Sequence, residues 1–166
     1  MVRRPDARRT PGGVCRVCFV CTGNICRSPT AEAVLRALAE RQGLGDRFEV
    51  DSAGTGAWHV DEPPDARSQH HAAARGWALQ GLRARQLRPE DFHRFDWLIA
   101  LDRSHLAALR RLAPPGSRAR LSLLMDFADG PAGREVPDPY YDGPQRFEQV
   151  LDLVEEACQG LLRRLA

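Results

Sequence analysis

One short segment of the sequence combines residue types that could carry out phosphoryl transfer. Cys21 and Arg27 stand with five residues between them, and Ser28 and Pro29 follow. The apolar run before Cys21 predicts a buried strand, and Pro29 opens a helical pattern. Backbone N–H groups and the positive end of that helix favour the nucleophilic thiolate, and the arginine fork fits two phosphate oxygens. The segment therefore predicts a reaction through a cysteinyl-phosphate.

The residues between these two ends suit a loop that wraps around an anion. Gly23 lets the backbone approach without a Cβ atom, and Asn24 tolerates left-handed dihedral angles. Ser28 is a good N-cap and Pro29 suits the first helical position, so an ordinary turn with buried cysteines is the weaker interpretation. The predicted phosphate-binding loop comprises Cys21, Thr22, Gly23, Asn24, Ile25, Cys26, Arg27 and Ser28.

The composition limits the class of protein. The chain has 166 residues, 43% of them hydrophobic, which predicts one domain over residues 14–166 after a mobile N-terminal tail at residues 1–13. A net charge of +2 argues against a nucleic-acid partner, and no apolar run is long enough to cross a membrane. All 24 basic residues are Arg, which excludes a Walker-type loop and lysine Schiff-base chemistry. An odd number of cysteines, four of them within residues 15–26, and no signal-peptide pattern indicate the reducing cytoplasm.

Strand-like and helix-like segments alternate along the chain. Strands are predicted at residues 14–20, 47–51, 96–101 and 118–123, and helices at 29–41, 64–75 and 103–112. A C-terminal helix is predicted from an apolar stripe of Phe147, Val150, Leu151, Val154, Ala157, Cys158 and Leu161. The alternation predicts an α/β fold whose parallel sheet is covered by helices on both faces. Ligands bind at the carboxyl ends of the strands in such a sheet. Cys21, Ser52 and Asp102 are each expected to follow the end of a strand.

Two segments of the chain resemble the low-molecular-weight protein tyrosine phosphatases. The string from Val20 to Pro29 is similar to that family's signature, and Pro137 to Tyr141 is similar to its acid loop. Four further segments follow the family's order, at residues 51–55, 64–67, 83–87 and 95–99. The resemblance covers about residues 14–165. It implies a flavodoxin-like, three-layer α/β sandwich with a four-stranded parallel sheet, and hydrolysis of phosphotyrosine and aryl phosphates.

The resemblance also implies roles that the residues alone leave open. Asp138 is implied to be the general acid that protonates the leaving oxygen and later activates water. Without the resemblance, three other carboxylates compete for that role: Asp126, Asp129 and Asp142. Ser28 is implied to donate a hydrogen bond to the Cys21 sulfur, and Ser52 either joins that network or only forms a turn. The predicted supporting residues are Asn24, Ser28, Ser52 and Asp102.

Residues around the substrate are implied in the same way. The expected walls of the cleft are Ile25, Trp58, Tyr140 and Tyr141, with a partly buried anchor as the alternative for Trp58. Cys26 is implied to form a reversible disulfide with Cys21 under peroxide, and a packing cysteine is the alternative. The two tyrosines are implied to be kinase targets. Leu82 stands where relatives often carry His, a departure that affects the expected polar network rather than the catalytic set.

Other functions on the same loop stay open as alternatives. Arsenate reductases and protein arginine phosphatases share it, but arginine-specific relatives tend to have Thr at the position of Ile25. An arsenate relay needs further cysteines in the later half, where only Cys158 lies. An iron–sulfur site is disfavoured because Cys15 and Cys18 point to opposite faces of a strand. A phosphotyrosine-binding module would need neither a nucleophile nor a general acid.

The sequence thus predicts a phosphoric monoester hydrolase that acts on phosphotyrosine. Its expected partners are a phosphotyrosine-bearing protein, such as a tyrosine kinase, and inorganic phosphate or another oxyanion in the loop. Neither a cofactor nor a metal is expected. The five histidines, at positions 59, 70, 71, 93 and 105, show no spacing typical of metal ligands.

Overall fold

Four parallel strands form the centre of the molecule. The computed structural model describes residues 13–166, so the predicted tail at residues 1–13 lies outside the described residues except for Gly13. The strands are β1 (Cys15–Cys21), β2 (Phe48–Gly54), β3 (Trp97–Ala100) and β4 (Arg120–Leu123). They pair in the order β2-β1-β3-β4, and all three pairings are parallel. The predicted four-stranded parallel sheet is confirmed, and it places β1 between β2 and β3.

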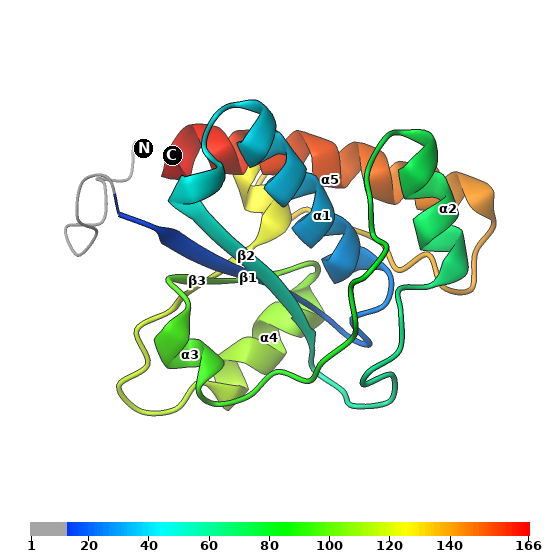
Figure 1. Ribbon diagram of the computed structural model, residues 1–166. Coiled ribbons are helices and arrows are strands. Elements are labelled where there is room, and N and C mark those ends of the chain that lie inside the picture. The colour runs from blue at the N-terminus through cyan, green and yellow to red at the C-terminus, as the bar shows by residue number, and fades with distance from the viewer. Residues whose placement is uncertain (1–12) are drawn as a thin grey trace.

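Helices cover both faces of this sheet, which confirms the predicted three layers (Figure 1). The helices are α1 (Arg27–Arg41), α2 (Ala66–Ala74), α3 (Asp91–Arg94), α4 (Arg103–Leu112) and α5 (Pro144–Leu165). Two short 3₁₀ helices, η1 (Gly45–Arg47) and η2 (Leu124–Phe127), precede β2 and follow β4. In Figure 1, α1, α2 and α5 lie on one side of the sheet, and α3 and α4 lie on the other.

Alternating side chains of β1 fill two separate cores. Cys15, Val17 and Phe19 pack into the core under α1 and α5, whereas Cys18 and Val20 pack into the core under α3 and α4. This alternation confirms that Cys15 and Cys18 point to opposite faces. The apolar stripe predicted for the last helix is buried along its whole length. A strand buried on both faces is typical of parallel sheets, and it gives the loop after β1 a rigid base.

Several element boundaries differ from the sequence prediction, and three of these differences bear on the site. Cys21 is the last residue of β1 rather than the first of the loop, because it pairs with Gly54 of β2. The same pairing extends β2, so Ser52 lies within the strand and not after it. Helix α1 begins at Arg27 with Cys26 as its N-cap, so Ser28 is not the cap. The Thr30 hydroxyl donates to the Cys26 carbonyl at 2.7 Å in this first turn.

No helix among residues 13–166 combines the length and the apolar character that crossing a bilayer requires.

Candidate active site

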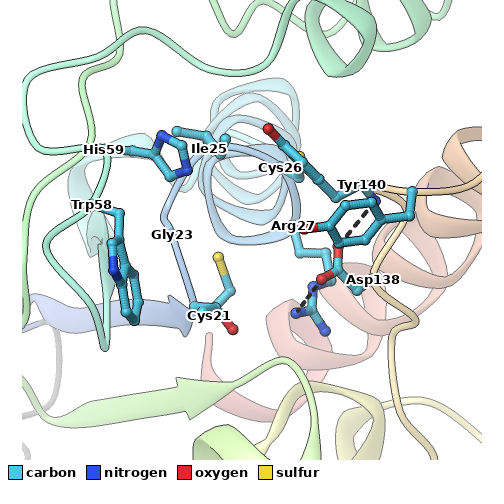
Figure 2. A pocket seen from close by; sticks show the side chains of 11 residues that line it. Cys21, Gly23, Ile25, Cys26, Arg27, Trp58, His59, Asp138 and Tyr140 are labelled. Atoms are coloured by element: carbon cyan, nitrogen blue, oxygen red, sulfur yellow. Dashed lines mark hydrogen bonds and ion pairs between the residues drawn. The ribbon is translucent and has the colours of Figure 1, made fainter.

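The loop between β1 and α1 lines a pocket at the carboxyl ends of the strands (Figure 2). Eleven residues line this pocket: Cys21, Thr22, Gly23, Ile25, Cys26, Arg27, Trp58, His59, Asp138, Tyr140 and Tyr141. They come from three parts of the chain, namely the predicted phosphate-binding loop, the loop after β2 and the loop before α5. The structure therefore brings the predicted nucleophile, clamp, acid and cleft residues together around one pocket.

The backbone carbonyls of the loop are held by hydrogen bonds from neighbouring segments. Those of Cys21, Thr22 and Ile25 accept from the backbone N–H groups of Thr55, Gly56 and Asp65 at 2.9, 3.1 and 2.8 Å. A trans peptide points its carbonyl and the next N–H in opposite directions, and the described chain has no cis peptide. The N–H groups of Thr22, Gly23 and Cys26 therefore point away from those segments. Such convergent donors form an anion-binding concavity.

Ser28 and Asn24 hold the cysteine end of the loop. The Cys21 sulfur lies 2.9 Å from Ser28 Oγ, which also accepts a hydrogen bond from Asn24 Nδ2 at 2.8 Å. Because the amide fills the acceptor side of the hydroxyl, the hydroxyl proton is directed at the sulfur. Asn24 adopts the left-handed conformation expected of it, with φ of 58°, and its Oδ1 accepts from the Arg85 N–H at 3.0 Å. This arrangement stabilises a negative charge on Cys21 Sγ.

A buried carboxylic acid lies behind this hydrogen-bond network. Asn24 Nδ2 donates to Ser52 Oγ at 2.9 Å, and Ser52 Oγ donates to Glu32 Oε1 at 2.6 Å. Ser52 thus joins the network and does not form a turn. Arg36 donates to the other oxygen of Glu32 at 2.6 Å, yet burial still raises the pKa of Glu32. No sequence signal singled out Glu32, because a glutamate on a helix ordinarily faces solvent.

Asp102 holds the arginine at the other end of the loop. Arg27 is 3% exposed, and its Nη1 donates to Asp102 Oδ2 at 2.7 Å and to the Val136 carbonyl at 3.0 Å. Asp102 is also the N-cap of α4, where its Oδ1 accepts from Ser104 Oγ and from the His105 N–H. Burial would raise the pKa of Asp102, but these hydrogen bonds outweigh it and lower the pKa. A permanent carboxylate therefore fixes the guanidinium that faces the pocket.

Asp138 lies beside Arg27, across the pocket from Trp58 (Figure 2). Its side chain is 52% exposed, and its Oδ2 lies 3.9 Å from Arg27 Nη2. The other oxygen accepts the Tyr140 N–H at 3.0 Å. Its three predicted rivals, Asp126, Asp129 and Asp142, do not line the pocket. Of these four candidates, Asp138 is the one that lines the pocket, and its role as the acid stays a prediction.

Comparisons with known proteins place the chain in a family. The family model of the low molecular weight phosphotyrosine protein phosphatases matches residues 16–166. The chain belongs to this family. A low molecular weight protein-tyrosine-phosphatase of Streptomyces coelicolor is 52% identical over 89% of this chain and 91% of its own. A protein tyrosine phosphatase crystal structure from Entamoeba histolytica is 34% identical, with a TM-score of 0.86 over 91% of this chain and 96% of that one.

One solved relative carries a different activity in its name. A structure described as drosophila arginine phosphatase is 34% identical to this chain. Its TM-score is 0.81, and the match covers 89% of this chain and 95% of that one. The fold of this phosphatase family is therefore shared by proteins with different named substrates. The substrate class has to be inferred from the side chains that form the walls of the pocket.

The walls of this family member's pocket are aromatic and mostly exposed. Trp58 is 75% exposed, so it is not the partly buried anchor considered as its alternative role. Tyr140 and Tyr141 form an edge-to-face pair with ring centroids 4.9 Å apart. Ile25 forms part of the lining and is 9% exposed. These side chains form an apolar rim beside the cysteine.

His59 is a pocket residue that the sequence analysis missed. It follows Trp58, and its ring packs on the loop, since a Cβ added to Gly23 would lie 2.9 Å from His59 Cδ2. Its Nδ1 contacts the Glu62 carboxylate. The sequence signal for it is its position next to the predicted wall residue Trp58, which spacing typical of metal ligands does not reveal.

Two further residues bear on the predicted regulation and polar network. Cys26 lines the same pocket as Cys21, and burial raises the pKa of its thiol to about 12. Both cysteines are free thiols, so the reversible disulfide between them stays a prediction.

Leu82 is partly buried and packs against the apolar core, while the Arg85 backbone supplies the partner for Asn24 Oδ1. The network behind the loop is thus complete without a histidine at that position.

Among residues 13–166, no three His, Cys, Asp or Glu side chains gather closely enough to hold a metal ion.

Proposed function

We propose that this chain hydrolyses phosphotyrosine in proteins through a cysteinyl-phosphate on Cys21. One observation carries the proposal: the Cys21 sulfur, 2.9 Å from the Ser28 hydroxyl, shares a pocket with Arg27 and Asp138. A nucleophile, a cationic fork and a carboxyl on one pocket are the parts that phosphomonoester cleavage needs. Simple aryl phosphates would react at the same site.

In the first step Cys21 Sγ attacks phosphorus, and the bond to the tyrosyl oxygen breaks. The three equatorial phosphoryl oxygens lie in the cradle of loop N–H groups, where Arg27 offers two parallel N–H donors. Asp138 gives its proton to the leaving oxygen, so the phenol departs neutral. The Asp102 contact keeps the guanidinium oriented, because Nη1 is held from behind at 2.7 Å.

In the second step water attacks the phosphorus of the cysteinyl-phosphate. Asp138, now a carboxylate, accepts a proton from that water, and its half-exposed position gives water access. The sulfur leaves as a thiolate, and the hydrogen bond from Ser28 Oγ stabilises its charge. Inorganic phosphate is the product, and it or another oxyanion would occupy the same loop.

The walls favour an aryl phosphate over a phosphoguanidine. Trp58 and Tyr140 line the pocket on two sides, which suits a flat phenyl ring. Ile25 presents an apolar side chain where arginine-specific relatives tend to have Thr. The structural similarity to the drosophila arginine phosphatase makes phosphoarginine the alternative substrate to test. Arsenate reduction is not supported, since Cys158 is fully buried in the core.

The protein substrate carries phosphotyrosine on an accessible segment, and a tyrosine kinase is a candidate of this kind. The exposed rim supports this choice, because Trp58 and Tyr141 can contact residues that flank the phosphotyrosine. Phosphorylation of Tyr140 and Tyr141, and the cytoplasmic location, stay predictions.

The test compares hydrolysis of a phosphotyrosine peptide, p-nitrophenyl phosphate and phosphoarginine by wild type and Cys21→Ser. Cys15→Ala is the matched control, because Cys15 lies at the opposite end of the same strand. We expect wild type and the control to cleave both aryl phosphates, and Cys21→Ser to bind phosphate without turnover. Turnover by Cys21→Ser would reject the nucleophile. A higher kcat/KM on phosphoarginine than on phosphotyrosine would reject the substrate class.

A further inference from the structure

A buried histidine lies behind the phosphate-binding loop and outside the pocket lining. His105 belongs to the first turn of α4 and is 2% exposed. Its backbone N–H donates to Asp102 Oδ1 at 3.0 Å, as part of the cap that opens the helix. This cap fixes the direction of the first turn and so places the imidazole between Asp102 and the loop.

The two ring nitrogens of His105 face different groups. Nε2 lies 2.7 Å from Thr22 Oγ1, and Nδ1 lies 3.1 Å from Asp102 Oδ1 without an aligned hydrogen bond. Burial lowers the pKa of His105 to about 4, although the nearby charges of Asp102, Arg27, Asp138 and Glu135 also act on it. The ring is therefore neutral near pH 7 and carries one proton.

The charge of Asp102 decides where that proton lies. A lone pair on Nδ1 would face the carboxylate oxygen at 3.1 Å, which is repulsive, whereas an N–H dipole is attracted to it. The proton thus belongs on Nδ1. Nε2 is then an acceptor, and the Thr22 hydroxyl donates to it.

These contacts join the two ends of the phosphate-binding loop. Thr22 follows the nucleophile directly, and Arg27 closes the loop six positions after Cys21. His105 holds Thr22, and Asp102, which faces the same imidazole, holds Arg27 at 2.7 Å. A buried imidazole with one poorly aligned nitrogen costs stability, and an apolar residue of similar size would avoid that cost. The arrangement therefore points to a role in the site rather than in packing.

We propose that His105 is a positioning residue for the phosphate-binding loop. It holds Thr22 and lies against Asp102, the carboxylate that orients Arg27, and so keeps the loop in the shape that a phosphoryl group needs. His105 touches neither the substrate nor the reacting atoms. The inference rests on the proposed function, because it assumes that the loop binds a phosphoryl group. It adds to that function a second anchor for the loop, independent of the network around Asn24 and Ser52.

Three variants separate this role from packing. His105→Leu has a similar volume and cannot accept a hydrogen bond, whereas His105→Gln can place an amide oxygen near the position of Nε2. Thr22→Val removes the hydroxyl on the other side of the contact. For each variant and the double variant Thr22→Val/His105→Leu, the measurements are kcat and KM for p-nitrophenyl phosphate, phosphate affinity by calorimetry, and the midpoint of denaturation.

We expect His105→Leu to weaken phosphate binding and to lower kcat/KM by about tenfold, because small displacements of positioned groups are costly. His105→Gln should stay within about threefold of wild type, since it keeps the acceptor. Thr22→Val should lower kcat/KM as well. In the double variant, kcat/KM should fall by less than about twofold below that of His105→Leu alone, because both changes break the same contact.

The proposal is overturned if folded His105→Leu keeps wild-type phosphate affinity and kcat/KM while losing only stability. It is also overturned if the losses from Thr22→Val and His105→Leu multiply in the double variant. Should His105→Leu not fold, Thr22→Val must reproduce the loss and His105→Gln must not, or the proposal fails. Absence of wild-type turnover would contradict the proposed function alone, and phosphate affinities would still decide on His105.

Discussion

Two of the three loops that line the pocket are held in different ways. In the phosphate-binding loop, Asn24, Cys26, Arg27 and Ser28 are buried. The side chains of Asn24 and Arg27 donate hydrogen bonds to Ser52 and Asp102, which belong to other parts of the chain. In the acid loop, residues 137–142, the side chains of Asp138 and Tyr141 are exposed. Two of its hydrogen bonds run within the loop, from the Tyr140 N–H to Asp138 and from the Asp142 N–H to the Pro139 carbonyl. A third comes from the neighbouring Arg146, whose Nε donates to the Asp142 carboxylate.

This difference corresponds to two tasks. Oxyanion binding requires donors that are oriented before the substrate arrives, and a buried network of hydrogen bonds supplies that order. Proton transfer to a leaving group and then from water requires a carboxyl group that solvent can reach, which an exposed loop supplies. The two loops meet where Arg27 Nη1 donates to the Val136 carbonyl, one residue before the acid loop begins.

The largest effect is expected from the arginine of the buried loop. Arg27→Lys keeps a positive charge but replaces the fork with a point charge, which cannot hold two equatorial oxygens at once. The loss of one oriented set of donors should lower kcat/KM by roughly 10²–10³-fold. Steady-state kinetics on p-nitrophenyl phosphate measure this loss. Arg16→Lys is the control, because Arg16 pairs with Glu49 near the far end of β1. A loss below about tenfold for Arg27→Lys would reject the clamp.

Asp138→Asn tests the exposed loop, and its effect should depend on the leaving group. A tyrosyl leaving group has a conjugate acid with a pKa of about 10, so it needs a proton, whereas nitrophenolate needs less help. We expect kcat/KM for a phosphotyrosine peptide to fall by about 10²-fold and that for p-nitrophenyl phosphate to fall much less. Asp142→Asn is the matched control in the same loop. Equal losses on both substrates would move the acid to another residue.

The smallest effect concerns stability and contrasts the two loops directly. Asn24→Ala removes three hydrogen bonds and forces a left-handed φ on alanine, so the free energy of unfolding should fall by about 2 kcal/mol. Asn24→Gly relieves the backbone part of that loss. Tyr141→Ala, at a side chain 91% exposed, should stay within about 0.5 kcal/mol of wild type. Urea denaturation measures both, and similar losses at both sites would show that the loops do not differ in rigidity.

The same contrast explains what the sequence alone could predict. The strand, loop and helix around Cys21 follow from local rules, namely an apolar run, a glycine, a residue that tolerates left-handed angles and a helix start. The stripe of the last helix follows from its period, and the parallel sheet follows from the alternation of elements. Asp138 required the resemblance, because nothing local distinguishes one exposed aspartate in a turn-rich loop from its neighbours.

The residues that were missed act through long-range contacts. Glu32 and His105 meet the site only because α1 and α4 pack against opposite faces of the sheet, and their own neighbours in sequence do not reveal this. The errors at the ends of β1 and β2 have the same origin. The pairing of Cys21 with Gly54 extends both strands by residues that local propensity assigns to loops. Tertiary contacts of this kind override local signals.

The most direct test of the account is to trap the covalent intermediate. Wild-type protein would be mixed with an aryl phosphate, quenched in acid within the first turnover, digested and analysed by mass spectrometry. Asp138→Ala would be treated in parallel with p-nitrophenyl phosphate, because loss of the base should slow hydrolysis of the intermediate and increase its amount. The account predicts phosphate on the Cys21 side chain, located by fragmentation of its peptide, and nowhere else. Phosphate on Cys26 or another side chain, or turnover with no phosphorylated peptide in either protein, would contradict it.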